Sequence, residues 1–138
     1  MTDSRSAWSL TVLRAVAGII FVMHGYPKLF GGIGNTAGFF EGLGIPLPTI
    51  AAWGIAILET AGGLALILGF LVTPVAILLA IHMLAGILLV HLPNGFYVVG
   101  PGQGGVEFNL LLIASLLTLI ALGPGAASID ESRGSEVP

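Results

Sequence analysis

Apolar residues run in four long blocks along the chain, and short stretches rich in glycine and proline separate them. A bilayer core of about 30 Å needs roughly 20 apolar residues per helix. Four segments have that length and character, near residues 8–30, 48–70, 74–92 and 105–123. The pattern therefore predicts an all-α fold, a polytopic membrane protein with a bundle of four transmembrane helices.

The same pattern divides the chain into three parts. Residues 1–7 form a polar N-terminal segment, and residues 8–125 hold the four-helix transmembrane domain. The sequence turns polar after the last block, so residues 126–138 are expected to be a disordered tail.

Two connections are longer than the others, and both fall on one face of the predicted bundle. They read GGIGNTAGFFEGLGIPLP after the first span and LPNGFYVVGPGQGG after the third. Neither shows a clear helical or strand period, so we expect two loops that together cover this face.

By contrast, the second and third spans are joined only by GFLVTP, where Thr73 can cap and Pro74 can open the third helix. These two spans are expected to touch.

Composition supports a membrane protein and excludes several other classes. Of the 138 residues, 56% are hydrophobic and 8% are charged, and mean hydropathy is +1.05, whereas soluble domains carry about 25% charged residues. The net charge of -3 leaves no basic field for nucleic acid. The absence of cysteine excludes disulfide exchange and thiolate metal centres, and no metal site is expected. The sequence requires no cofactor, so any redox role would depend on a bound ligand or a partner.

Localisation follows from the same features. The first apolar block is broken by Arg14 and lacks a small-residue cleavage site, so we expect a retained first span in the plasma membrane. Arg5, Arg14 and Arg133 lie towards the side that holds both termini, and Lys28 lies at the other side. The positive-inside rule then predicts cytoplasmic termini.

Polar residues within or beside the spans are the candidate functional residues. A charge at mid-bilayer costs about 2.5–3.5 kcal/mol on insertion scales, so such residues normally face the bundle interior and pair there. The set comprises Arg14, His24, Lys28, Glu59, His82, His91, Glu107 and Asn109.

Depth in the bilayer indicates which members of this set can meet. At 1.5 Å per residue, Glu59 and His82 both lie about 15 Å from the two-loop face, so they can contact each other. Arg14 lies roughly 9 Å deeper than Glu59, a gap that a long guanidinium could partly bridge. We expect Glu59 to be the hub, with Arg14 as its partner if it has only one.

A second polar layer is expected nearer the two-loop face, where His24 lies one turn before Lys28 on the same helical face. His91, Glu107 and Asn109 come within a turn or two of the surface there. Ordinary structural alternatives stay open for single residues: Lys28 as an interfacial anchor, Glu107 as a helix N-terminal charge, His82 as a core histidine, and Glu59 as part of a packing ion pair.

Histidine, glutamate and asparagine in an apolar cavity could hydrogen-bond a quinone-like carbonyl and transfer protons. Aromatic residues, Tyr26 among them, could supply walls for a ring, although they could equally be ordinary membrane-interface aromatics. Haem is disfavoured because no attachment motif or histidine spacing singles out an axial pair.

The order of four sequence blocks resembles the DoxX family of small integral membrane proteins. The blocks are LRAVAGIIFVMHGYPKLFGGIG, GFFEGLGIP, ILETAGGLALILGFLVTPVAILLAIHMLAGILLVHLPNGF and GGVEFNLLLIASLLTLIALGPGAASID. The resemblance implies a four-helix membrane bundle, and the characteristic positions of the family then fall on Arg14, His24, Gly25, Lys28, Glu59, Gly63, His91, Glu107 and Asn109. His82 is not among those positions, which counts against its pairing with Glu59.

The family resemblance also implies a functional setting. The family name comes from a subunit linked to thiosulfate:quinone oxidoreductase, and relatives are associated with oxidative-stress or thiol-handling complexes. The first hypothesis is therefore a membrane subunit of a redox system that binds a quinone-like molecule and works with a protein partner in the bilayer. Two alternatives stay open: a small proton or solute transporter, and a non-catalytic assembly factor, and in each case the chain could form homo-oligomers.

Overall fold

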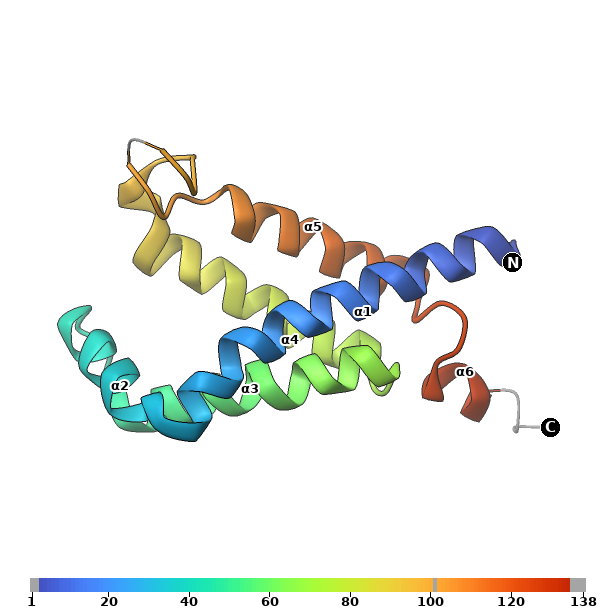
Figure 1. Ribbon diagram of the computed structural model, residues 1–138, viewed down its shortest axis with the longest axis horizontal. Helices are drawn as coiled ribbons and strands as arrows, with labels where there is room; N and C mark the ends of the chain where they lie inside the picture. The colour runs from blue at the N-terminus through green and yellow to red at the C-terminus, as the bar shows by residue number, and fades with distance from the viewer. Residues whose placement is uncertain (1–2, 101, 135–138) are drawn as a thin grey trace.

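A computed structural model describes residues 3–100 and 102–134 of the chain (Figure 1), and this described part is helical with no strand. Its α-helices are α1 (Ser4–Pro27), α2 (Ile33–Gly42), α3 (Pro48–Leu68), α4 (Val72–Gly86), α5 (Glu107–Leu122) and α6 (Ile129–Gly134). A π-helical turn, Lys28–Gly32, joins α1 to α2, and two short turns, Ile87–His91 and Leu92–Asn94, extend α4.

The long helices run side by side, with α1 packed mainly on α3 and α4 packed mainly on α5. The start of α1 and helix α6 lie at one end of this bundle, on the right in Figure 1. Helix α2 and the connection before α5 lie at the opposite end. The prediction that both longer connections share one face is therefore confirmed.

Within the described residues, three helical segments are long and apolar enough to cross a membrane: Ser4–Gly42, Pro48–Leu68 and Val72–Asn94. The apolar helix α5 is shorter, with 16 residues. Many large apolar side chains on these helices face outward, as expected where lipid surrounds the protein. The all-α class with long apolar helices is confirmed, and the count of four spans stays a prediction.

Glycine allows α1 and α3 to pack with their backbones in contact. A Cβ atom added at Gly63 would lie 2.6 Å from the carbonyl oxygen of Gly18, and one added at Gly25 would lie 2.5 Å from Oγ1 of Thr60. Small residues permit this close approach between membrane helices. The contact sets the end of α1 directly over the middle of α3, where Glu59 lies.

The first long connection is not a loop, so our expectation for it is wrong. Phe30 and Gly31 leave helical geometry, with φ/ψ of -106°/41° and 143°/-7°, and the chain then turns into α2. Thr36, Phe39, Phe40 and Leu43 follow a helical spacing and face one cavity. This helical spacing is short and glycines interrupt it, so the sequence pattern did not predict a helix. The second connection has no helix between Gly95 and Val106 in its described residues, as expected.

The boundaries at both ends of the chain also differ from expectation. Ser4–Ala7 are not a separate segment but the first turns of α1, which Asp3 caps by accepting from the Ser6 backbone N–H at 2.8 Å. That bond lowers the pKa of Asp3. Residues 126–134, expected to be part of a disordered tail, instead include α6 and pack back on the bundle, whereas residues 135–138 lie outside the described part.

One acidic side chain explains the ordered C-terminal segment. The carboxylate of Asp130 accepts from the backbone N–H groups of Leu71 at 2.9 Å and Val72 at 2.8 Å. These groups open α4, so Asp130 caps this helix in place of the predicted Thr73. The cap also joins the chain end to the turn between α3 and α4.

Candidate functional site

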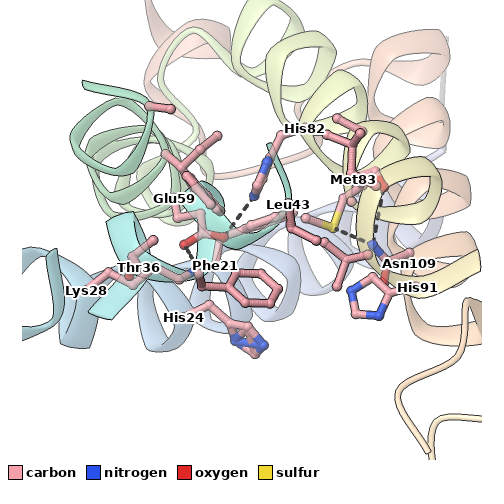
Figure 2. Close-up of a pocket in the computed structure, with 18 of the residues that line it drawn as sticks. Phe21, His24, Lys28, Thr36, Leu43, Glu59, His82, Met83, His91 and Asn109 are labelled. Atoms are coloured by element: carbon pink, nitrogen blue, oxygen red, sulfur yellow. Dashed lines mark hydrogen bonds and ion pairs between the residues drawn. The ribbon is translucent and has the colours of Figure 1, made fainter. Parts of the chain in front are cut away.

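A cavity of about 660 Å³ lies in the half of the bundle nearest α2 (Figure 2). Helices α1 to α5 all contribute to its lining. Its polar lining residues are His24, Lys28, Asn35, Thr36, Glu59, His82, His91 and Asn109, and its apolar walls include Phe21, Phe39, Phe40, Met83, Phe108 and Leu112. Six of these polar residues were predicted candidates.

Glu59 is the hub of the polar side chains, as expected. It is buried on α3, with 3% exposure. Lys28 Nζ donates to Glu59 Oε2 at 2.5 Å, and His82 Nε2 lies 2.9 Å from Glu59 Oε1. A carboxylate can only accept here, so Nε2 of His82 carries a proton. The predicted Glu59–His82 contact is confirmed, and the family pattern alone would have missed it.

Local structure explains why Lys28 reaches Glu59. Lys28 is the first residue after α1, and Gly25 lies one turn earlier against Thr60 of α3. The missing Cβ at Gly25 brings the end of α1 down onto α3, so the long lysine side chain reaches the carboxylate while remaining 29% exposed. This pairing satisfies a buried charge that would otherwise be costly.

Arg14 does not pair with Glu59, so that prediction is wrong. Its guanidinium, 1% exposed, instead donates to four backbone carbonyls at the end of the bundle that holds the termini. The acceptors are Leu66 at 3.2 Å, Ile67 at 3.3 Å, Ala126 at 3.3 Å and Ala127 at 3.1 Å. Leu66 and Ile67 lie in the last turn of α3, where the carbonyl oxygens carry partial negative charge and attract the cation.

His91 and Asn109 form a second polar wall of the cavity. His91 Nδ1 lies 2.6 Å from the carbonyl oxygen of Gly104, and Asn109 Nδ2 donates to the carbonyl oxygen of Met83 at 3.2 Å. In Figure 2 these two side chains lie together, apart from the Lys28–Glu59 pair. His24 lies beside the ring of Phe108, with 6.4 Å between ring centroids.

Two further candidates do not line the cavity. Glu107 is the first residue of α5, and its Oε1 accepts from the Val98 backbone N–H at 2.8 Å, so it fastens the second connection. Tyr26 is 55% exposed and packs on the ring of Phe30, with centroids 4.6 Å apart. Both positions match the ordinary structural alternatives for these residues.

Sequence reasoning missed the contribution of α2 to the cavity. Asn35, Thr36, Phe39 and Phe40 line it from this helix. The spacing of Thr36, Phe39, Phe40 and Leu43 was the available signal, but it spans only two turns.

Comparison with known proteins assigns the chain to a family. Residues 9–92 match the DoxX family model. The chain belongs to the DoxX family. Two similar members are inner membrane proteins of Escherichia coli: YphA is 30% identical over 123 residues, covering 88% of this chain and 87% of YphA, and YqjF is 34% identical over 124 residues, covering 86% and 87%.

A third DoxX relative has a name that mentions an activity. "Putative oxidoreductase CatD" of Bacillus subtilis is 33% identical over 119 residues, covering 86% of this chain and 82% of CatD. No solved structure matches the chain at a significant level. The relatives place this DoxX protein among membrane proteins, in agreement with its long apolar helices.

Proposed function

We propose that this protein is a multi-pass subunit of a membrane redox system that binds a quinone-like small molecule in the cavity. The observation that carries the proposal is the convergence of three histidines and the Lys28–Glu59 pair on one largely apolar cavity. Its volume of about 660 Å³ lies within the roughly 300–1,000 Å³ typical of small-molecule sites.

The lining suits an oxygen-bearing ring. Phe21, Phe39 and Phe108 offer aromatic surface, while the ammonium of Lys28 and the imidazoles offer hydrogen bonds and proton transfer. The chain has no cysteine, so in this proposal the bound ring and a protein partner carry the electrons. The name of the relative CatD, a putative oxidoreductase, is consistent with a redox setting.

The proposal includes a fourth span and cytoplasmic termini. Helix α5 has 16 residues, which corresponds to about 24 Å of helix. It packs along α4, and the chain continues past it to α6 at the end of the bundle that holds the N-terminus. Arg5 and Arg133 at that end favour the cytoplasmic side.

A proton relay across the bilayer has less support from the geometry. Such a relay would link Arg14 to Glu59, yet Arg14 bonds only to backbone carbonyls among the residues that the structure describes. The polar groups therefore form two separate sites, and only one of them adjoins the cavity.

The test is ligand binding by the full-length protein in mild detergent. Mass spectrometry of co-purifying small molecules and calorimetric titration with a short-chain ubiquinone should both detect a ring compound. Glu59→Gln should weaken the titrated affinity by about tenfold or more, because it removes a charge that orients Lys28 and His82. Glu107→Gln is the matched control, since Glu107 lies outside the cavity. Absence of any bound ring compound, with no binding of the added quinone, would contradict the proposal.

A further inference from the structure

Hydrogen bonds already made at the cavity wall restrict the chemistry of the ligand. We infer that the site prefers a ring bearing a phenolic hydroxyl, such as a quinol, over the fully oxidised quinone. This inference rests on the proposed function and specifies the redox form that the cavity recognises. It depends on the side chains of His91 and Asn109.

His91 presents a hydrogen-bond acceptor to the cavity. Its Nδ1 lies 2.6 Å from the carbonyl oxygen of Gly104. A carbonyl oxygen has no proton to donate, so Nδ1 must carry the hydrogen of this bond. In the neutral imidazole Nε2 is then a bare lone pair. Within the described residues nothing donates to Nε2, so it remains for a ligand.

Asn109 presents a second acceptor beside the first. Its Nδ2 donates to the carbonyl oxygen of Met83, and its Oδ1 accepts no hydrogen bond from the residues that the structure describes. The two side chains flank Gly86, where an added Cβ would lie 3.1 Å from Nδ2 of Asn109 and 3.9 Å from Cδ2 of His91. This wall, formed by the neighbouring side chains of His91 and Asn109, therefore offers two acceptors to the cavity.

The opposite side of the cavity offers donors. Each oxygen of Glu59 already has one hydrogen-bond partner, Lys28 at Oε2 and His82 at Oε1. Lys28 has three N–H donors and uses one of them on Glu59. A ligand oxygen at this side can accept from the ammonium, whether that oxygen belongs to a carbonyl or a hydroxyl.

A phenolic hydroxyl matches this arrangement better than a quinone carbonyl. At the His91–Asn109 wall a hydroxyl donates to a waiting acceptor, whereas a carbonyl brings a third acceptor and no proton. Sites that are built to hydrogen-bond a hydroxyl discriminate strongly against analogues that lack it, because their polar groups are left unpaired. The quinol should therefore bind at least about tenfold more tightly than the quinone.

The experiment compares three probes on the unmodified full-length protein in mild detergent. The probes are a short-chain ubiquinol kept reduced under anaerobic conditions, the matching ubiquinone, and the dimethyl ether of the quinol, each titrated by calorimetry. We expect the quinol to bind most tightly, with the quinone and the ether both weaker by about tenfold or more. The ether separates hydroxyl donation from ring shape.

A substitution at His91 tests whether the His91–Asn109 wall causes the preference for the quinol. His91→Phe should reduce the quinol-to-quinone affinity ratio towards one, chiefly through weaker quinol binding, whereas Glu107→Gln should leave the ratio unchanged. A thermal unfolding curve in the same detergent checks that each variant is folded, and the probe comparison on the unmodified protein stands without the variants.

The outcomes separate the two proposals. Equal binding of quinol and quinone, or tighter binding of the quinone, would overturn the preference and leave the proposed function intact. Failure of every ring probe to bind would overturn the proposed function and the preference together.

Discussion

Glu59 is a buried carboxylate with both oxygens paired, one to Lys28 and one to His82. The pairing holds three helical segments together at the cavity: the end of α1, the middle of α3 and the middle of α4. Because removal of one partner leaves the other charge buried, the stability of this site depends on the pair and not on either residue alone.

The first prediction concerns this pair. Lys28→Met should lower the free energy of unfolding by about 1–3 kcal/mol, because Glu59 then keeps only His82 as a partner. Adding Glu59→Gln should recover part of the loss, since the uncompensated charge disappears. Denaturant titration in detergent, followed through the fluorescence of Trp8 and Trp53, measures both changes. Strictly additive losses in the double variant would contradict the coupling.

For single residues, the sequence predicted the Glu59–His82 contact but not the partners of Arg14. Helical rise alone placed Glu59 and His82 at one depth, and the contact follows. Depth could not place Arg14, because its acceptors are backbone carbonyls, two of them in a segment that looked like a polar tail. Every residue has a backbone carbonyl, so the sequence does not show which carbonyls accept a hydrogen bond from Arg14.

Among the helices, the close contact of α1 with α3 positions the site. The short GFLVTP connection predicted contact between the second and third spans, whereas the close backbone contact lies between the first and second, at Gly18 and Gly63. Glycine is common in membrane helices, so composition alone does not identify which glycines face a neighbour.

The second prediction tests that contact. Gly63→Ala should lower the free energy of unfolding by about 1–3 kcal/mol, because the new methyl group would meet the backbone of α1. Gly54→Ala, in the same helix with nothing within 4 Å of the added atom, should be neutral or stabilising by up to about 1 kcal/mol. The two variants are compared by thermal unfolding in one detergent. Equal stability of both would argue against a tight α1–α3 contact.

The third prediction concerns the start of α4. Asp130→Ala should cost about 0.5–2 kcal/mol, because the backbone N–H groups of Leu71 and Val72 lose their acceptor. Thr73→Val is the informative control: if Thr73 capped the helix, as the sequence suggested, that variant would be the more damaging one. Denaturant titration of the two variants ranks them.

The hydrophobic pattern of the sequence did not predict helix α2 or the ordered C-terminal segment. The period of α2 covers about two turns and is interrupted by Gly34, Gly38 and Gly42, so local preference opposes a helix that tertiary packing over the cavity favours. Likewise, residues 126–134 are held in place by contacts with Arg14 and with the start of α4, which are distant in sequence.

Across the whole molecule the intramembrane polar groups are divided between two ends. Arg14 and its carbonyl acceptors lie at the end that holds the termini, and the cavity with Glu59 lies nearer α2 and the second connection. The first site fastens the chain end to the bundle, and the second is open to a ligand. In the proposed function, only the end of the bundle with the cavity binds a ligand, and the Arg14 end fastens the C-terminal segment.

The last prediction tests the membrane topology that this division requires. The chain has no cysteine, so single cysteines introduced at exposed positions report sidedness without background. With four spans, Ser4→Cys and Gly134→Cys should both react with a membrane-impermeant maleimide only from the cytoplasmic side, and Gln103→Cys only from the opposite side, in intact and inverted vesicles. If α5 did not cross, Gly134→Cys would react on the same side as Gln103→Cys. Because the start of α1 and helix α6 lie at the same end of the bundle, labelling of Ser4→Cys and Gly134→Cys from opposite sides would contradict the arrangement of the helices as well as the count of spans.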